Sequence, residues 1–265
     1  LKLRNPDKDT VLYPAVSYPS YSMGAQLANC RSVAVPVDEE WRIDLSRIDK
    51  KDIERAICLW VNSPGNPAGA IEDLEKIADW GKANEVMILS DECYIEFTWE
   101  TSPKSVLQSS EKGVLAVHSL SKRSNLAGMR VGFYAGDLEL VNYLREVRKH
   151  QGLMLSGPAQ NAGIAAMNDQ AHVDEQKQLY LGRLSKLMNI FDSLGIETVM
   201  PEGAFYLWIA APEADEWRLV QELSKTLGMV VTPGEFFGEK GKGYIRVAAV
   251  ATDDRIELLE QRAGV

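Results

Sequence analysis

The first half of the chain alternates short apolar runs with segments of helical periodicity, and this alternation limits the fold more than any other feature. In segment 72–85, Leu74, Ile77, Ala78 and Gly81 recur at the spacing of one helix face. Strand–helix–strand units of this kind build a mainly parallel sheet that helices cover. Six runs have the length and apolar content of buried strands: 11–13, 32–35, 56–61, 86–90, 113–118 and 131–135.

From about Gly157 the pattern becomes helical, and Pro158 suits the first turn of a helix. One face of a long helix that ends at Gly195 carries apolar side chains: Tyr180, Leu184, Leu187, Met188 and Phe191. Strand-like runs then alternate with helix-like ones: 203–210, 216–228, 229–234, 243–250 and 253–261. We therefore expect a large domain in residues 1–156, followed by an interdomain helix and a small C-terminal α+β domain in residues 157–265.

Composition excludes several classes of function. The net charge of −9 over 265 residues argues against a nucleic-acid or anionic-membrane surface, and no apolar stretch is long enough to span a bilayer. The three cysteines are odd in number and lack metal-ligand spacing, which favours a reducing cytoplasm. The three histidines indicate neither a catalytic triad nor a metal site.

Polar residues gather where the expected strands end, which is where α/β sheets bind ligands. These residues are Asn66, Asp91, Tyr94, Ser119, Ser121, Lys122 and Arg130. Each alone has an ordinary structural explanation: a surface lysine, a capping aspartate, a tight turn in 62–69, an ion-paired arginine. Together they match pyridoxal 5′-phosphate (PLP), which needs a Schiff-base lysine, a carboxylate for its ring nitrogen, donors for its phenolic oxygen, and hydroxyls and a cation for its phosphate.

The motifs "NPAG", "SDECY", "SLSK" and "GMRVG", in this order and spacing, resemble those of class I/II aminotransferases of PLP fold type I. With "YPSY" before them and "YIRVA" after them, the resemblance covers essentially the whole chain. It implies an α/β fold, with a mainly parallel sheet sandwiched by helices and a smaller C-terminal α+β domain. It also implies a homodimer whose active sites lie at the subunit interface.

The resemblance assigns catalytic roles to Lys122, Asp91 and Tyr94, and a cofactor-binding role to Asn66. Lys122 forms the Schiff base with PLP and, once released, moves the proton at the substrate α-carbon. Asp91 pairs with the ring nitrogen of the cofactor. Asn66 and Tyr94 hydrogen-bond its phenolic oxygen.

The resemblance also assigns binding roles. Ser119, Ser121 and Arg130 hold the phosphate, and Tyr18 stacks on the cofactor ring. Arg246 clamps the α-carboxylate of the substrate in a bidentate fork, which a lysine does poorly.

The chain departs from the family pattern in two places. Ala68 stands where a threonine is usual after "NP", which removes a hydroxyl but neither proposed contact of that loop. The family's remaining phosphate contacts, a glycine-and-serine turn that opens a helix, precede anything present here, and the chain begins at Leu1. We therefore expect the sequence to represent a longer protein and to bind PLP poorly by itself.

Longer segments, among them "SKRSNLAG" and "RKHQGLM", resemble succinyldiaminopimelate aminotransferases of actinobacterial type. This implies a place in lysine and diaminopimelate biosynthesis, with glutamate donating an amino group to N-succinyl-2-amino-6-oxopimelate. Because both substrates are acidic, further cations are candidates for contacts beyond the α-carboxylate: Arg123, Arg148, Lys149 and His150.

Three alternatives stay open at this point. One is another class I/II aminotransferase, acting on aspartate, aromatic or branched amino acids. A second is a PLP lyase that eliminates at the β-carbon with the same lysine. A third, from another class, is a non-catalytic PLP-binding half of a transcription regulator, which would carry a helix-turn-helix domain upstream.

Overall fold

The computed structural model describes residues 7–265, so the first six residues of the expected large domain lie outside the described residues. A six-stranded sheet has the order β2-β1-β3-β4-β5-β6. Every neighbouring pair is parallel except β5 and β6. The strands are β1 (Thr10–Pro14), β2 (Arg31–Val35), β3 (Ala56–Asn62), β4 (Met87–Asp91), β5 (Val114–Ser119) and β6 (Gly132–Gly136). The expected mainly parallel sheet is therefore confirmed, with each strand within a residue of its predicted bounds.

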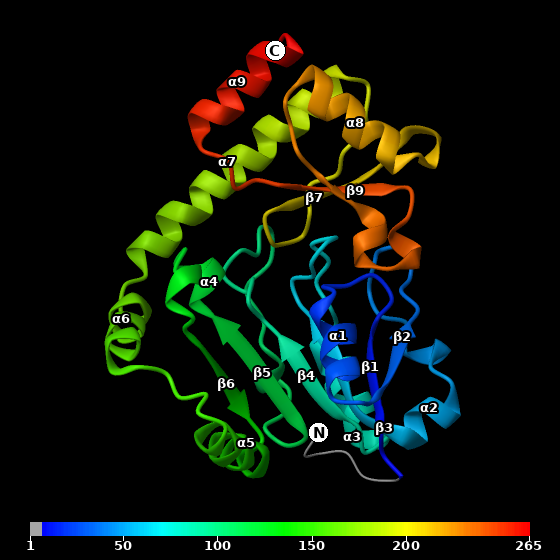
Figure 1. Ribbon diagram of the computed structural model, residues 1–265, viewed down its shortest axis with the longest axis vertical. Coiled ribbons are helices and arrows are strands. Elements are labelled where there is room, and N and C mark those ends of the chain that lie inside the picture. The colour runs from blue at the N-terminus through cyan, green and yellow to red at the C-terminus, as the bar shows by residue number, and fades with distance from the viewer. Residues whose placement is uncertain (1–6) are drawn as a thin grey trace.

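Helices cover this sheet and lead into the second half of the chain (Figure 1). They are α1 (Ser20–Leu27), α2 (Lys50–Arg55), α3 (Leu74–Ala83), α4 (Leu120–Arg123), α5 (Leu138–His150), α6 (Gly157–Met167), α7 (Ala171–Ser193), α8 (Glu216–Thr226) and α9 (Asp253–Ala263). The α3 helix begins where the Asp73 carboxylate accepts the backbone N–H of Lys76. Its buried face is the predicted one, and Gly81 allows close packing because a Cβ there would lie 2.6 Å from Ile88.

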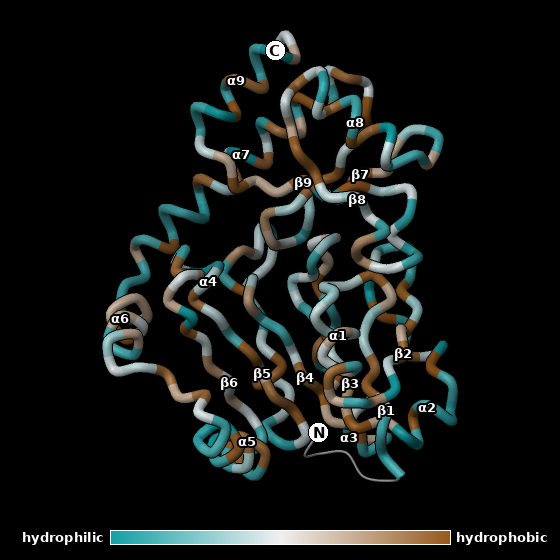
Figure 2. Tube along the Cα trace, in the orientation of Figure 1, coloured by the Kyte–Doolittle hydropathy of each residue, from teal (hydrophilic) through white to brown (hydrophobic). Residues whose placement is uncertain are grey.

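The core of the large sheet is aliphatic at its centre and becomes polar toward the ends of the strands. Leu12, Leu59, Val61, Ile88 and Ala116 are fully buried from solvent. Figure 2 shows the same trend, with hydrophobic colour along the central strands that fades toward their carboxyl ends. Polar side chains that could bind a ligand thus gather at the carboxyl-end edge of this sheet.

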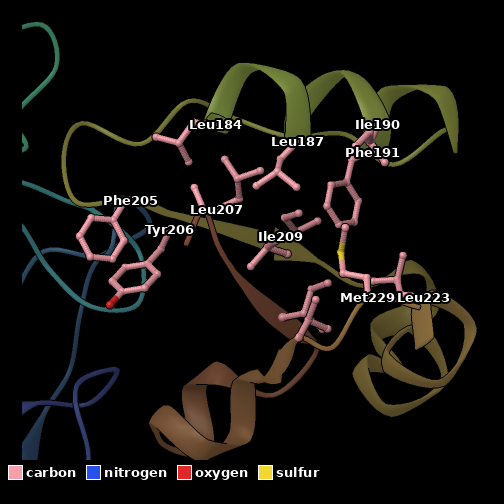
Figure 3. Packing of buried hydrophobic residues seen from close by; sticks show 14 of the residues in the cluster. Leu184, Leu187, Ile190, Phe191, Phe205, Tyr206, Leu207, Ile209, Leu223 and Met229 are labelled. Carbon is pink, nitrogen blue, oxygen red and sulfur yellow. The ribbon is translucent and has the colours of Figure 1, made fainter. Parts of the chain in front are cut away.

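A second, three-stranded antiparallel sheet has the order β7-β9-β8. Its strands are β7 (Tyr206–Ala210), β8 (Thr232–Pro233) and β9 (Tyr244–Ala248). The apolar face of α7 packs against it, as Figure 3 shows for Leu184, Leu187 and Phe191. In Figure 1 the arrowheads of β4 and β5 point toward this smaller sheet.

The strand predicted at 229–234 is wrong in extent, because only the two residues of β8 pair with a neighbour. Met229 and Val231 are buried in the core, whereas Val230 is 89% exposed. The alternation of buried and exposed side chains in 229–231 therefore reflects packing against the core, and the backbone there is not paired with a neighbouring strand. Proline at position 233 lacks the N–H that would extend the ladder.

Three features considered from composition can be examined in the described residues: membrane-spanning helices, metal-ligating clusters and the state of the cysteines. Among residues 7–265, no helix is both long enough and apolar enough to cross a membrane. The same residues contain no group of three or more side chains suited to hold a metal ion. Cys30, Cys58 and Cys93 are free thiols.

Glu72 is a buried carboxyl in the segment that connects β3 to α3. Its two oxygens lie 3.1 and 3.4 Å from the backbone nitrogen of Ile43, which donates to them. Its own N–H donates to Ser63 Oγ at 3.1 Å. Burial raises the pKa of Glu72 to about 7, from an ordinary value of 4.5. The folded protein therefore binds this proton more tightly than the unfolded chain does.

We expect Glu72→Gln to stabilise the protein at pH 8. The raised pKa contributes stability below pH 4.5 that is lost as the pH rises through about 7, and glutamine stays neutral throughout. The gain should be about 3 kcal/mol at pH 8 and should vanish near pH 4.5. Urea unfolding at both pH values measures it, with Glu75→Gln on the exposed side of α3 as the control. An equal effect at the two pH values would contradict a role for charge.

Candidate active site

A cavity of about 380 Å³ lies where the carboxyl ends of the large sheet face the smaller sheet. Polar side chains from both sheets border it. All of the site residues expected from the sequence do so: Tyr18, Asn66, Asp91, Tyr94, Ser119, Ser121, Lys122, Arg130 and Arg246. Tyr21, Asn62 and Tyr206 also border it and were not expected.

The direction of the strands explains this convergence. Asn62, Asp91 and Ser119 are the last residues of the parallel strands β3, β4 and β5, so they reach the same edge. Arg130 precedes β6, which is antiparallel and therefore begins at that edge. Residues that are far apart in sequence are brought together by sheet topology alone.

Lys122 belongs to the short helix α4 that follows β5. The hydroxyl of Ser119 caps this helix by accepting the backbone N–H of Ser121 at 3.1 Å. Lys122 borders the cavity, and its amine has no hydrogen-bond or ion-pair partner within residues 7–265. An amine in this environment is available to react with a ligand in the cavity.

Asp91 is held in place by several donors. The hydroxyl of Tyr21 donates to Asp91 Oδ2 at 2.8 Å, and the backbone N–H of Cys93 donates to Oδ1 at 3.2 Å. Asn62 Nδ2 donates to the backbone carbonyl of Asp91 at 2.9 Å. Burial and the neighbouring carboxylate raise the pKa of Tyr21 well above its usual value, so its hydroxyl stays protonated and donates.

Tyr21 is a site residue that the sequence reasoning missed. Its ring stacks on Trp60, with centroids 5.1 Å apart and an interplanar angle of 18°. The signal was present in "YPSY", whose second tyrosine lies three residues after Tyr18. Tyr18 itself is 47% exposed and meets the Tyr21 ring edge-on, with centroids 6.2 Å apart.

Arg246 reaches the cavity from β9 and has no acidic partner among residues 7–265. Its Nη1 donates to Asn66 Oδ1 at 2.7 Å, and its Nη2 lies 3.4 Å from Thr232 Oγ1. The guanidinium carbon sits 4.4 Å from the Tyr206 ring centre and 4.8 Å from that of Phe237. The Nε atom is buried without a hydrogen-bond partner. Because buried donors are normally satisfied, this guanidinium is suited to a carboxylate ligand.

The loop that carries Asn66 is fixed from both sides. Asn62 Oδ1 accepts the backbone N–H of Asn66 at 2.8 Å. Further along the loop, the N–H of Gly203 donates to the Gly69 carbonyl at 2.9 Å. A Cβ on Gly69, whose φ is +74°, would lie 2.5 Å from the Gly203 oxygen. Glycine at both positions therefore allows the large domain to approach the 200–204 segment.

Tyr94 and Tyr206 share a hydrogen bond across the two sheets. Their hydroxyl oxygens lie 2.7 Å apart, and either can be the donor. Burial raises the pKa of both phenols, so both hydroxyls keep their protons at neutral pH. Tyr206 was also missed, because a tyrosine within an apolar strand such as "FYLWIA" is typical of a core position.

The residues present fit PLP. The cavity is bordered by a free amine on Lys122, a carboxylate on Asp91 and a phenol on Tyr94. It is also bordered by the hydroxyls of Ser119 and Ser121. Arg130 adds a cation, although its Nη1 also donates to the Ala127 carbonyl at 2.8 Å. The orphaned Nε of Arg246 adds an unmet donor for a substrate carboxylate.

The additional cations expected near the substrate do not border this cavity. Arg123 is only 8% exposed, and its guanidinium is occupied by Glu96, the Ala166 carbonyl and Gln170. It ties α4 to α6 and to the start of α7. The other three, Arg148, Lys149 and His150, form the last turn of α5. The described residues therefore give no support to a substrate contact by any of these four candidates.

The comparison with known families agrees with this geometry. Residues 2–261 match the model of the family described as aminotransferase class I and II. The chain therefore belongs to the class I and II aminotransferases, which are PLP-dependent enzymes, and it has their fold type I. This confirms the fold class and the cofactor expected from the motifs.

Several curated relatives of this chain are transaminases or aminotransferases by name. It is 39% identical to the 4-dedimethylamino-4-oxo-anhydrotetracycline transaminase OxyQ of Streptomyces rimosus, covering 96% of this chain and 70% of that protein. It is 38% identical to a probable aminotransferase of Mycobacterium tuberculosis, covering 94% and 58%. It is 35% identical to the LL-diaminopimelate aminotransferase of Aquifex aeolicus, covering 94% and 67%. The chain thus spans 58% to 70% of the length of these relatives.

Solved structures give the same result. The substrate-bound structure of BacF from Bacillus subtilis superposes with a TM-score of 0.91 at 27% identity, covering 98% of this chain and 69% of that one. A probable N-succinyldiaminopimelate aminotransferase from Thermus thermophilus superposes with a TM-score of 0.86 at 26% identity, covering 99% and 73%.

Proposed function

We propose that the protein is a succinyldiaminopimelate aminotransferase, which moves the amino group of glutamate to N-succinyl-2-amino-6-oxopimelate with PLP as its cofactor. The observation that supports transaminase activity is that three reactive groups border the same cavity. These are the amine of Lys122, the hydrogen-bonded carboxylate of Asp91 and the guanidinium of Arg246; within the described part of the chain the amine is unpaired and the guanidinium has no acidic partner.

Each group has a distinct task in this proposal. When bound, PLP supplies an electron-withdrawing ring that stabilises negative charge on the substrate α-carbon. Lys122 holds the cofactor and moves the proton of the substrate α-carbon as a general base. Asp91 keeps the ring nitrogen protonated, and the donor from Tyr21 fixes its orientation. Asn66 and Tyr94 donate to the phenolic oxygen.

The remaining groups hold the ends of the ligand. Ser119, Ser121 and Arg130 bind the phosphate, and Tyr18 covers the cofactor ring. Arg246 binds the substrate α-carboxylate and orients the α-carbon toward Lys122. Asn66 Oδ1 accepts one of the Arg246 donors, so a substrate carboxylate would compete with this contact.

The substrate assignment is supported by names among the relatives. One is an LL-diaminopimelate aminotransferase, and a structural neighbour is a probable N-succinyldiaminopimelate aminotransferase. Both names refer to the diaminopimelate skeleton that the sequence resemblance implied. The three free thiols agree with a protein of the reducing cytoplasm, and the family resemblance implies a homodimer.

A second candidate is a class I/II aminotransferase with another substrate. It is favoured by the higher identity to OxyQ, at 39%, than to the diaminopimelate enzyme, at 35%. A β-lyase or a regulator domain receives no such support, since the relatives compared here are named as transaminases or aminotransferases.

The test is an absorbance titration of the full-length protein with PLP. Adding N-succinyl-diaminopimelate should convert the visible band of the bound cofactor to the near-ultraviolet band of its amine form, and 2-oxoglutarate should restore it. Conversion by glutamate but not by the succinylated compound would support the second candidate. Absence of any band from bound cofactor would contradict the aminotransferase assignment.

Arg246→Lys should weaken binding of the carboxylate while leaving the cofactor in place. Lysine keeps the charge but lacks the planar fork, so the KM for the amino donor should rise about 10- to 100-fold with a smaller effect on kcat. Steady-state kinetics measure the change, with Arg255→Lys at a 71% exposed side chain as the matched control. An equal loss of PLP absorbance would mean that Arg246 acts on the structure of the site instead.

A further inference from the structure

Tyr206 contacts two of the proposed catalytic groups at once. Its hydroxyl lies 2.7 Å from that of Tyr94, and its ring lies 4.4 Å from the guanidinium carbon of Arg246. It is 4% exposed, and its ring packs against Phe205 at a centroid distance of 5.0 Å. Figure 3 shows its hydroxyl directed away from Leu207 and the apolar cluster of the smaller sheet. Tyr206 therefore combines a core position with a polar atom at the site.

The direction of the hydrogen bond between the two tyrosines decides what Tyr94 can do. Each phenol has one proton to donate. If Tyr94 donates to Tyr206, its proton is used and cannot reach a ligand in the cavity. If Tyr206 donates to Tyr94, the Tyr94 proton is free to face the cavity that Tyr94 borders. Only the second arrangement lets Tyr94 donate to the phenolic oxygen of the cofactor.

No other hydrogen-bond partner of either hydroxyl is found among residues 7–265. Burial raises the pKa of both phenols, so neither loses its proton and the pair shares two hydrogens at neutral pH. The ionisable groups that act on the pair from neighbouring elements include Asp91, Arg246, Tyr18, Tyr21 and Tyr180.

We propose that Tyr206 is a positioning residue that donates its hydroxyl proton to Tyr94, orients the Tyr94 proton toward the cofactor's phenolic oxygen and strengthens that hydrogen bond. A phenol that accepts a hydrogen bond becomes a better donor through its own O–H. The inference rests on the proposed function, since it concerns the same cofactor. It adds a residue of the smaller sheet to the control of cofactor basicity.

The position of Arg246 favours donation from the Tyr206 hydroxyl to Tyr94. A guanidinium over the face of the Tyr206 ring withdraws electron density from it, which makes the phenol a stronger donor. The same ring supports Arg246 for carboxylate binding. Tyr206→Phe keeps the ring under Arg246 and removes only the hydroxyl, so it separates the two tasks of this residue.

The experiment measures the pH midpoint at which the visible absorbance of PLP in the full-length protein changes. A weaker hydrogen bond to the phenolic oxygen destabilises its ionised form. Tyr206→Phe should therefore raise the midpoint by about 0.5 to 1 unit, which is roughly three- to tenfold in the proton equilibrium. Replacement of Tyr206 by 3-fluorotyrosine, a stronger donor of nearly the same shape, should lower the midpoint.

A double-mutant cycle shows whether Tyr206 acts through Tyr94. In a Tyr94→Phe background, Tyr206→Phe should leave the midpoint unchanged. An unchanged midpoint in the single Tyr206→Phe variant, a shift of equal size in the Tyr94→Phe background, or an upward shift with fluorotyrosine would each overturn the inference. A wild-type protein that shows no absorbance from bound PLP would instead overturn the proposed function.

Discussion

Replacing Lys122 with alanine is expected to abolish transamination, with a loss in rate of at least about a thousandfold. The Lys122 amine borders the cavity and has no hydrogen-bond or ion-pair partner among residues 7–265. Alanine removes both the attachment of the cofactor and the group that moves the proton of the substrate α-carbon. Single-turnover absorbance changes with the amino donor measure the loss.

The matched control is Lys149→Ala. Lys149 lies on α5, where its amine is 3.4 Å from a Glu146 carboxylate oxygen and does not border the cavity. This variant should keep the parental rate. Transamination by Lys122→Ala at the parental rate would contradict the assignment of Lys122, and with it the catalytic arrangement proposed for this cavity.

Asp91→Asn is expected to cause the second largest loss. Asparagine keeps an oxygen that can accept the Tyr21 hydroxyl, so the local hydrogen bond at 2.8 Å can be retained while the negative charge is lost. A protonated ring nitrogen would then lack its counter-charge in a site shielded from water. Because the charge of Asp91 acts mainly in the transition state, we expect its loss to lower kcat by about 100- to 1000-fold.

Steady-state kinetics with saturating PLP test this expectation, and a cofactor absorbance spectrum shows whether binding is retained. Asp192→Asn, at an exposed position near the end of α7, is the control for the loss of one carboxylate. A variant at position 91 with full activity would show that the ring nitrogen needs no charged partner here.

Most of the large sheet could be predicted because its local signals and its tertiary environment agree. The apolar runs at β3, β4 and β5 are buried in the sheet centre, and the face of α3 spaced by Leu74, Ile77, Ala78 and Gly81 packs on them. In such segments, periodicity reports burial directly. The strand prediction for segment 229–234 was wrong in extent because buried side chains such as Met229 and Val231 do not require a paired backbone.

The candidate site was predictable to the extent that its residues follow strand ends or lie in family motifs. Asp91 and Ser119 end strands, and Lys122 follows in the next helix, so their convergence needed only a parallel sheet. Arg246 was found through the motif "YIRVA", and the structure places it beside Asn66, 180 positions earlier in the sequence.

What the sequence by itself determined is therefore the fold class, the family and the chemistry offered at the strand ends, since these depend on residue type and local spacing. The tertiary structure alone decided which cationic side chains are free to bind a ligand and which tyrosine hydroxyls hydrogen-bond to each other. Arg123 is taken by contacts with α6 and with the residue preceding α7, whereas Tyr206 meets Tyr94 across the two sheets. Such pairings depend on how distant elements pack, and no local pattern encodes the partner of a buried polar group.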